Sequence, residues 1–124
     1  MCNRKRIGVF LCLISSFASA EITINSDYER CINTASGQSL NICMDKELKL
    51  QDTKLNKEYH NTMERIQEFR KKDLKKIQRL WIKYRDAKCE FYYHKYSGSG
   101  DLTDSIQCAI KETLQRTEEL KNTY

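Results

Sequence analysis

Cysteines are the residues of this sequence whose type and spacing point most directly to chemistry. The chain has 124 residues and six cysteines, and four of these lie beyond residue 20: Cys31, Cys43, Cys89 and Cys108. Four cysteines in a small domain can form two disulfides in three ways. A zinc site is the alternative, but zinc-binding cysteines usually come in pairs about two to four residues apart, and these intervals are longer. The spacing therefore favours two disulfides and no metal site.

The glycine positions favour one of the three pairings. Residues equidistant from the turn of an antiparallel hairpin lie level with each other. The midpoint of Cys31 and Cys43 is Gly37, and the midpoint of Cys89 and Cys108 falls between Gly98 and Ser99. The chain has only four glycines, so both midpoints favour Cys31–Cys43 and Cys89–Cys108 over the crossed pairings. Each bridge would contribute about 3 kcal/mol in the chain-entropy model.

No combination of side chains indicates catalysis. His60 and His94 fall on different expected helices, and neither has a cysteine or serine in a recognisable nucleophile arrangement. Pairs of glutamates lie among lysines on polar faces, whereas an acid–base pair needs one desolvated carboxyl group with a raised pKa. A glycine-rich phosphate loop is absent. We therefore predict a protein that is not an enzyme, with no catalytic residue and no cofactor.

Residues 65–88 are strongly basic, with ten Lys or Arg against three Asp or Glu. Such a helix face can meet an anionic partner, such as an acidic protein, phosphorylated envelope sugars or lipid headgroups. The alternative is a solvated face that is balanced by acidic residues on neighbouring helices. The sequence leaves both interpretations open.

The segment from Gln78 to Cys89 places chemically distinctive side chains on one side of a helix. Spacings of three and four bring Gln78, Trp81, Arg85 and Cys89 to the same face. The Arg85 guanidinium can therefore stack on the Trp81 indole. A partly buried arginine also needs carboxylate or carbonyl oxygens, which a facing helix must supply. This pattern predicts a polar network that anchors helix packing beside a disulfide.

Helices must position these residues. Between Ser39 and Tyr96 there is no Gly or Pro, and apolar residues recur at helical spacing. One helix of that length would run about 87 Å and would need a second chain to cover its apolar side. We predict instead a break at residues 70–73, where cations suit a helix end and Asp73 can cap the next helix. An unbroken helix in a dimer is the alternative.

A third helix is predicted after the Ser-Gly turn, with first-turn caps or acids at Asp101, Thr103 and Asp104. A short arm, Tyr28 to Ala35, would be held back by the first disulfide. The predicted fold is all-α: an antiparallel three-helix domain with a short N-terminal arm and two disulfides.

The first twenty residues resemble a signal peptide. Arg4, Lys5 and Arg6 precede a short apolar run from Ile7 to Ile14, and Ala18-Ser19-Ala20 provides a cleavage site. The run is too short to span a bilayer, and Leu11 before Cys12 does not suit lipidation. Removal of residues 1–20 lowers the number of basic residues from 22 to 19, while all 17 acidic residues remain. We expect a domain of residues 21–124, periplasmic or secreted, that does not bind nucleic acid.

Four ordered elements of the chain share the residues of a known family. These are the pair Cys31 and Cys43, the element Leu55, Asn56 and Tyr59, the cluster from Gln78 to Cys89, and the closing Cys108, Thr113, Arg116 and Leu120. In these elements the sequence resembles the LprI-type lysozyme inhibitors, which are exported bacterial proteins. The corresponding family-motif residues in this chain are Leu55, Asn56, Tyr59, Gln78, Trp81, Tyr84, Arg85, Asp86, Thr113 and Arg116.

The resemblance implies a small helical inhibitor that binds a lysozyme or a related peptidoglycan hydrolase. Occlusion of the sugar-binding cleft by one end of the bundle is the expected mechanism. The candidate inhibitory surface is the turn between the last two helices with its neighbours: Tyr92, Tyr93, Tyr96, Asp101 and Asp104. Two alternatives are an envelope-binding module that uses the basic face and an immunity partner for a cell-wall hydrolase. Oligomeric state is not determined by the sequence.

Overall fold

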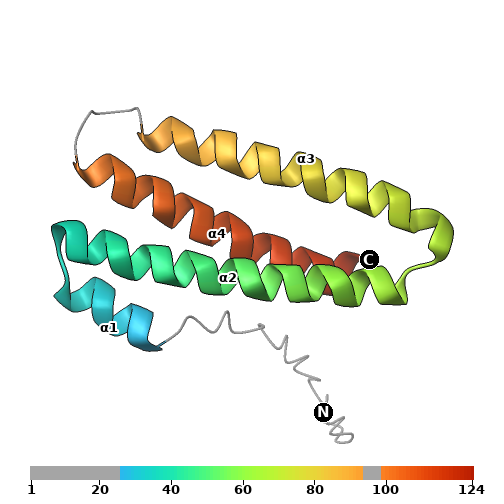
Figure 1. Ribbon diagram of the computed structural model, residues 1–124, viewed down its shortest axis with the longest axis horizontal. Helices are drawn as coiled ribbons and strands as arrows, with labels where there is room; N and C mark the ends of the chain where they lie inside the picture. The colour runs from blue at the N-terminus through green and yellow to red at the C-terminus, as the bar shows by residue number, and fades with distance from the viewer. Residues whose placement is uncertain (1–25, 94–98) are drawn as a thin grey trace, which may run out of the picture.

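The computed structural model describes residues 26–93 and 99–124, and within these residues it contains helices and no strands. The helices are α1 (Ser26–Thr34), α2 (Gly37–Arg65), α3 (Glu68–Tyr93) and α4 (Ser99–Thr123). Helix α4 lies between α2 and α3, and α1 packs on the first part of α2 (Figure 1). The all-α, three-helix prediction with a short N-terminal arm is confirmed, and the arm is itself a helix.

One apolar cluster lies at the end of the bundle that carries α1. It is built on Tyr28 of α1, Met44 of α2 and Ile110 of α4, and the half-buried side chains around these are Leu40, Leu48, Ile106 and Leu114. No α3 residue takes part in this cluster. Burial of each large apolar side chain stabilises the fold by about 1.5–3 kcal/mol, so this cluster holds α1, α2 and α4 together.

A second apolar cluster lies at the other end and joins α2, α3 and α4. Its buried members are Leu55, Leu74 and Leu120, and the side chains packed around them are Tyr59, Met63, Ile66, Trp81 and Tyr124. Leu74 and Leu120 are among the most completely buried side chains of the described residues. The apolar attachment of α3 to the bundle is therefore concentrated in its first half.

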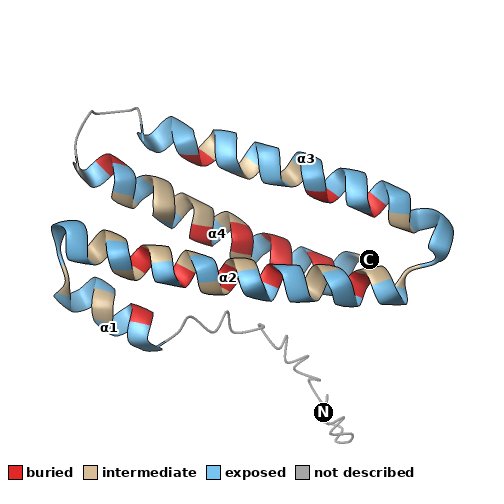
Figure 2. Cartoon of the chain, in the orientation of Figure 1, coloured by how far each residue is buried: buried red, intermediate tan, exposed pale blue. Residues whose placement is uncertain are grey.

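Buried residues lie on the facing sides of the helices (Figure 2), and some of them are polar. Buried polar residues on α2, α3 and α4 include Gln51, Thr62, Gln78, Thr113, Arg116 and Thr117. The threonine hydroxyls donate to carbonyls one turn earlier on their own helices, as Thr113 does to Ala109 at 2.7 Å. These bonds satisfy the hydroxyl groups, so their burial is tolerated.

The break between α2 and α3 lies at residues 66–67, so the predicted break at residues 70–73 is wrong. Ile66 adopts extended backbone angles, while residues 70–73 continue α3. The turn is set by contacts that the local sequence does not contain. Ile66 packs on the second apolar cluster, and the Arg65 guanidinium donates to the carbonyls of Leu120 and Lys121 at the end of α4, where helix carbonyls lack partners.

Both predicted disulfides are present. The Cα atoms of Cys31 and Cys43 are 6.2 Å apart, and those of Cys89 and Cys108 are 5.4 Å apart, as disulfide geometry requires. The first bridge ties α1 to α2, and the second ties the end of α3 to α4. The four cysteines are therefore not available as zinc ligands.

Helix α4 begins at Ser99, so Asp101, Thr103 and Asp104 lie inside it and do not cap it. Asp101 remains in the first turn, where a negative charge is favourable. Within the described residues, no helix has an apolar stretch of the length that is needed to cross a bilayer.

The turn between α1 and α2 depends on Gly37, whose φ angle is +55°. Replacing Gly37 with Ala should destabilise the protein by about 1 kcal/mol, because a side chain is strained in this conformation. A Cβ atom there meets nothing within 4 Å, so the cost comes from the backbone alone. Thermal unfolding of the oxidised protein measures it.

Gly100→Ala is the matched control. Gly100 lies in α4, it does not have a positive φ angle, and a Cβ atom there also meets nothing. Its replacement should leave stability unchanged or raise it slightly. Equal losses in both variants would contradict this role for Gly37.

Candidate functional site

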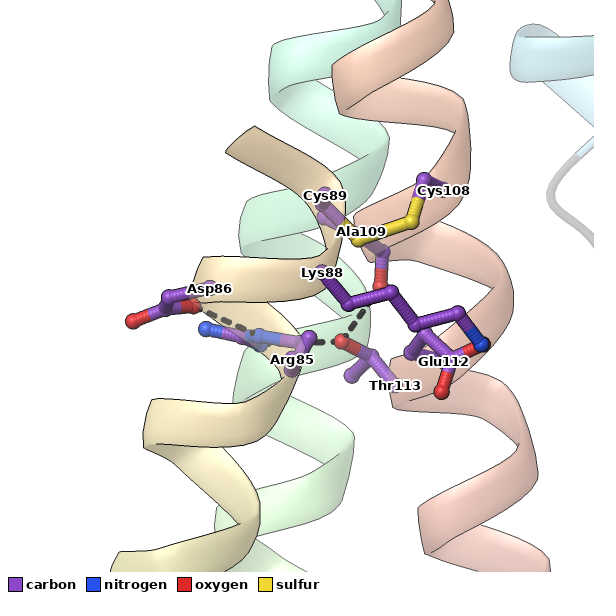
Figure 3. The surroundings of a disulfide bond; sticks show 8 residues. All are labelled: Arg85, Asp86, Lys88, Cys89, Cys108, Ala109, Glu112 and Thr113. Atoms are coloured by element: carbon purple, nitrogen blue, oxygen red, sulfur yellow. Dashed lines mark hydrogen bonds and ion pairs between the residues drawn. A yellow bond between two sulfur atoms is a disulfide. The ribbon is translucent and has the colours of Figure 1, made fainter. Parts of the chain in front are cut away.

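Arg85 joins the three long helices. Its Nη1 donates to Asp52 Oδ1 on α2 at 2.7 Å and to Thr113 Oγ1 on α4 at 2.9 Å. Its Nε donates to Asp86 Oδ1 at 3.0 Å. The Arg85 side chain is 13% exposed, so these charge-assisted bonds form in a largely desolvated position, where they are strong. Figure 3 shows the Thr113 and Asp86 contacts.

The pKa of Arg85 reflects these partners. Burial of the guanidinium acts to lower its pKa, but the hydrogen bonds and negative charges of Asp52 and Asp86 outweigh this effect and raise the pKa above its ordinary value. Arg85 therefore carries its charge at any physiological pH.

Trp81 lies between two guanidinium groups. The Cζ of Arg85 is 5.3 Å from the centre of its ring, which agrees with the stacking expected from the sequence, and the Cζ of Arg116 is 6.0 Å away. Arg116 is only 2% exposed. Its Nε donates to Gln78 Oε1 at 2.9 Å, and its Nη1 pairs with Glu119 at 2.8 Å. Gln78, Trp81, Arg85 and Arg116 therefore form one continuous structural network.

The second disulfide is flanked by an ion pair (Figure 3). Lys88 Nζ lies 2.7 Å from Glu112 Oε1, so that α3 and α4 are joined by a charge pair one residue before Cys89. Hydrogen bonds from Lys88 to Glu112 and Tyr84 raise the pKa of Lys88. This end of α3 is thus held to α4 by covalent and polar contacts.

The remaining family-motif residues are divided between core and surface. Leu55 and Tyr59 belong to the second apolar cluster. Asn56 and Tyr84 are exposed. The hydrogen bonds of Arg85 within the described residues go to Asp52, Asp86 and Thr113, and not to Asn56. Most of the motif therefore stabilises the bundle.

The candidate inhibitory surface is only partly accessible. Tyr92, Tyr93 and Asp104 are exposed near the junction of α3 and α4. Asp101 is 4% exposed and has an interaction partner, which argues against its contact with a target. Tyr96 lies outside the described residues, as does His94. His60 is exposed on α2 beside the Tyr59 ring.

Asp52 is the partner of Arg85 on α2, and the sequence analysis did not predict this pair. It lies four residues after Leu48 and three before Leu55, which places a carboxylate on the apolar stripe of α2. The position of this carboxylate could have predicted an ion pair, because a carboxylate on the buried face of a helix needs a cation from another element.

Replacing Arg85 with Gln should destabilise the protein by about 2 kcal/mol, because Asp52 and Thr113 lose a charged hydrogen-bond partner. Urea unfolding with both disulfides intact measures the change. Arg79→Gln is the matched control, since Arg79 is exposed on the same helix; it should change stability by less than about 0.5 kcal/mol. Equal effects of the two substitutions would refute the bridging role of Arg85.

Comparison with known proteins identifies the family of this chain. The family model for the lysozyme inhibitor LprI matches residues 31–120, a range that begins in α1 and ends in α4. An uncharacterized protein of Rhizobium meliloti (strain 1021) is 33% identical over 105 residues, which cover 73% of this chain and 76% of the relative. No solved structure matches the chain significantly. The chain belongs to the LprI lysozyme inhibitor family.

Proposed function

We propose that this protein is an exported, non-enzymatic inhibitor that binds a lysozyme or a related peptidoglycan hydrolase and occludes its active-site cleft. The observation that carries the proposal is the family match over residues 31–120. That range contains both disulfides and the contacts of Arg85, so these links between the helices all lie within the matched region.

The end of the bundle where α3 stops and α4 starts is the proposed contact surface. Two exposed aromatic side chains, Tyr92 and Tyr93, lie at the end of α3. Aromatic side chains of this kind dominate binding at protein interfaces. The Cys89–Cys108 bridge and the Lys88–Glu112 ion pair hold the helix ends together. A preorganised surface loses little conformational entropy on binding.

The charge of this end of the bundle also supports it as the contact surface. Residues 86–112 contain five acidic and three basic residues, and Asp104 is an exposed acidic residue of this segment. Many lysozymes are cationic, so this end is electrostatically complementary to their surface, which favours fast association. Asp101, being buried, is left out of the proposed contact.

Cell-wall turnover by lysozymes of several classes, titrated with the oxidised protein, tests the proposal. We expect inhibition of at least one class at near-stoichiometric ratios. The double variant Tyr92→Ser/Asp104→Lys should weaken inhibition about tenfold or more, because it removes an aromatic contact and reverses a charge.

The double variant Phe69→Ser/Glu64→Lys is the matched control. Both residues are exposed near the turn between α2 and α3, at the other end of the bundle. It makes the same kinds of change and should leave inhibition unaltered. Absence of inhibition in every class at an excess of protein would refute the proposed function, and equal weakening by both variants would refute the proposed surface.

Export is part of the proposal, because disulfides persist in oxidising compartments outside the cytoplasm. Cleavage after Ala20 should give a secreted or periplasmic protein whose first residue is Glu21. Intact-mass analysis of the exported protein, before and after reduction, measures both the start site and the number of disulfides. A mass that retains residues 1–20 would contradict the proposed cleavage.

A further inference from the structure

Helix α3 carries a row of large apolar side chains that no other helix covers. Phe69, Ile77, Leu80, Tyr84 and Phe91 are separated by intervals of eight, three, four and seven residues, which return to one side of a helix. Phe69 is 76% exposed, Phe91 69%, Leu80 56% and Tyr84 55%. The row extends over about 33 Å of helix. We call these five residues the apolar row.

The apolar row is separate from the face that α3 uses for packing. The packing face contains Leu74, Gln78, Trp81, Arg85 and Cys89, which meet α4 and its neighbours. The outer side of α3 is the edge of the bundle away from α2 (Figure 1), and it is largely exposed in Figure 2. Several exposed large apolar side chains on one side of a helix are typical of an interaction site; Asp73, four residues from Phe69 and from Ile77, is an exposed acidic residue on the same side.

Unpaired cations run beside the apolar row. Five exposed residues form this basic row: Lys72, Lys75, Lys76, Arg79 and Lys83. Within the described residues, none of the five has an ion-pair partner, whereas Lys71, Arg85 and Lys88 do. Lys76 and Lys83 are four and three residues from Leu80, so cations and apolar side chains are neighbours on the surface.

We propose that this side of α3 binds the surface of a membrane that contains anionic lipids. The combination fits that partner because helices that lie in a membrane interface insert apolar side chains between the headgroups while lysines contact the phosphates. An anionic glycan would pair with the basic row but leave Phe69, Leu80 and Phe91 in water. The apolar row therefore favours lipid over glycan.

A second copy of the chain fits this surface less well. Two copies that met through the apolar row would bring their basic rows close together, and like charges in a partly desolvated interface repel. The proposed inhibitory end, by contrast, has an excess of acidic residues. Membrane binding through α3 therefore uses a different surface and charge from the proposed hydrolase contact, and neither proposal depends on the other.

Vesicle co-sedimentation of the full oxidised protein tests the inference. We expect binding to phosphatidylcholine vesicles that contain about 30% phosphatidylglycerol, and little binding to pure phosphatidylcholine. Binding should weaken as salt rises from about 0.05 M to about 0.5 M, because exposed charges are screened. Absence of binding to the anionic vesicles would overturn the proposal.

Two variants separate the contributions of the two rows. Lys76→Gln/Arg79→Gln/Lys83→Gln should reduce binding to the anionic vesicles at least about tenfold. Leu80→Ser/Phe91→Ser keeps every charge and should also reduce binding at least about tenfold, because the inserted side chains are lost. Thermal unfolding confirms that each variant is folded, as expected for substitutions of exposed residues.

Matched controls place the same changes elsewhere. Lys54→Gln/Lys57→Gln/Lys111→Gln removes three exposed charges from α2 and α4, and Ile42→Ser removes an exposed apolar side chain from α2. Each should change vesicle binding by less than about threefold. If the charge control loses as much vesicle binding as the basic-row variant, binding depends on net charge alone and the proposed surface is wrong. Unchanged binding of Leu80→Ser/Phe91→Ser, or binding to teichoic acid without binding to vesicles, would reject the lipid surface as the partner.

Discussion

The bundle depends on a single guanidinium group that is shared by three helices. Helix α4 separates α2 from α3, yet Arg85 of α3 reaches Asp52 of α2 and Thr113 of α4 at the same time. The apolar contacts of α3 are concentrated near Leu74 and Trp81. The second half of α3 is therefore oriented by Arg85, by the Lys88–Glu112 pair and by the disulfide at Cys89. These contacts are directional, so they determine the rotation of α3 as well as its position.

This rotation decides which side of α3 is exposed. With Gln78, Arg85 and Cys89 facing α4, the apolar row and the basic row face outward. The same contacts hold the aromatic end of α3 beside the start of α4. The structural network thus leaves two surfaces of different charge exposed: the outer side of α3, and the end of the bundle where α3 stops and α4 starts. A small inhibitor that lies on a membrane through one surface would keep the other available to a hydrolase.

The family motif identifies the frame of the domain more than its binding surface. Leu55, Trp81, Arg85, Thr113 and Arg116 all take part in packing or in buried polar contacts. Residues that form a frame are constrained by many neighbours at once, whereas exposed residues are not. The motif therefore accounts mainly for the architecture, and Tyr92 and Asp104 of the proposed contact surface lie outside it.

Features that depend on local spacing were predictable from the sequence alone. The helical class and the stacking of Arg85 on Trp81 follow from intervals of three and four residues within one segment. The two disulfide pairings follow from the equal distance of each cysteine pair from a glycine position between them. The break at residues 66–67, the choice of Asp52 as the partner of Arg85 and the burial of Asp101 required the tertiary structure. Each of these depends on which residue of a facing helix lies opposite, and that is decided only when the helices pack.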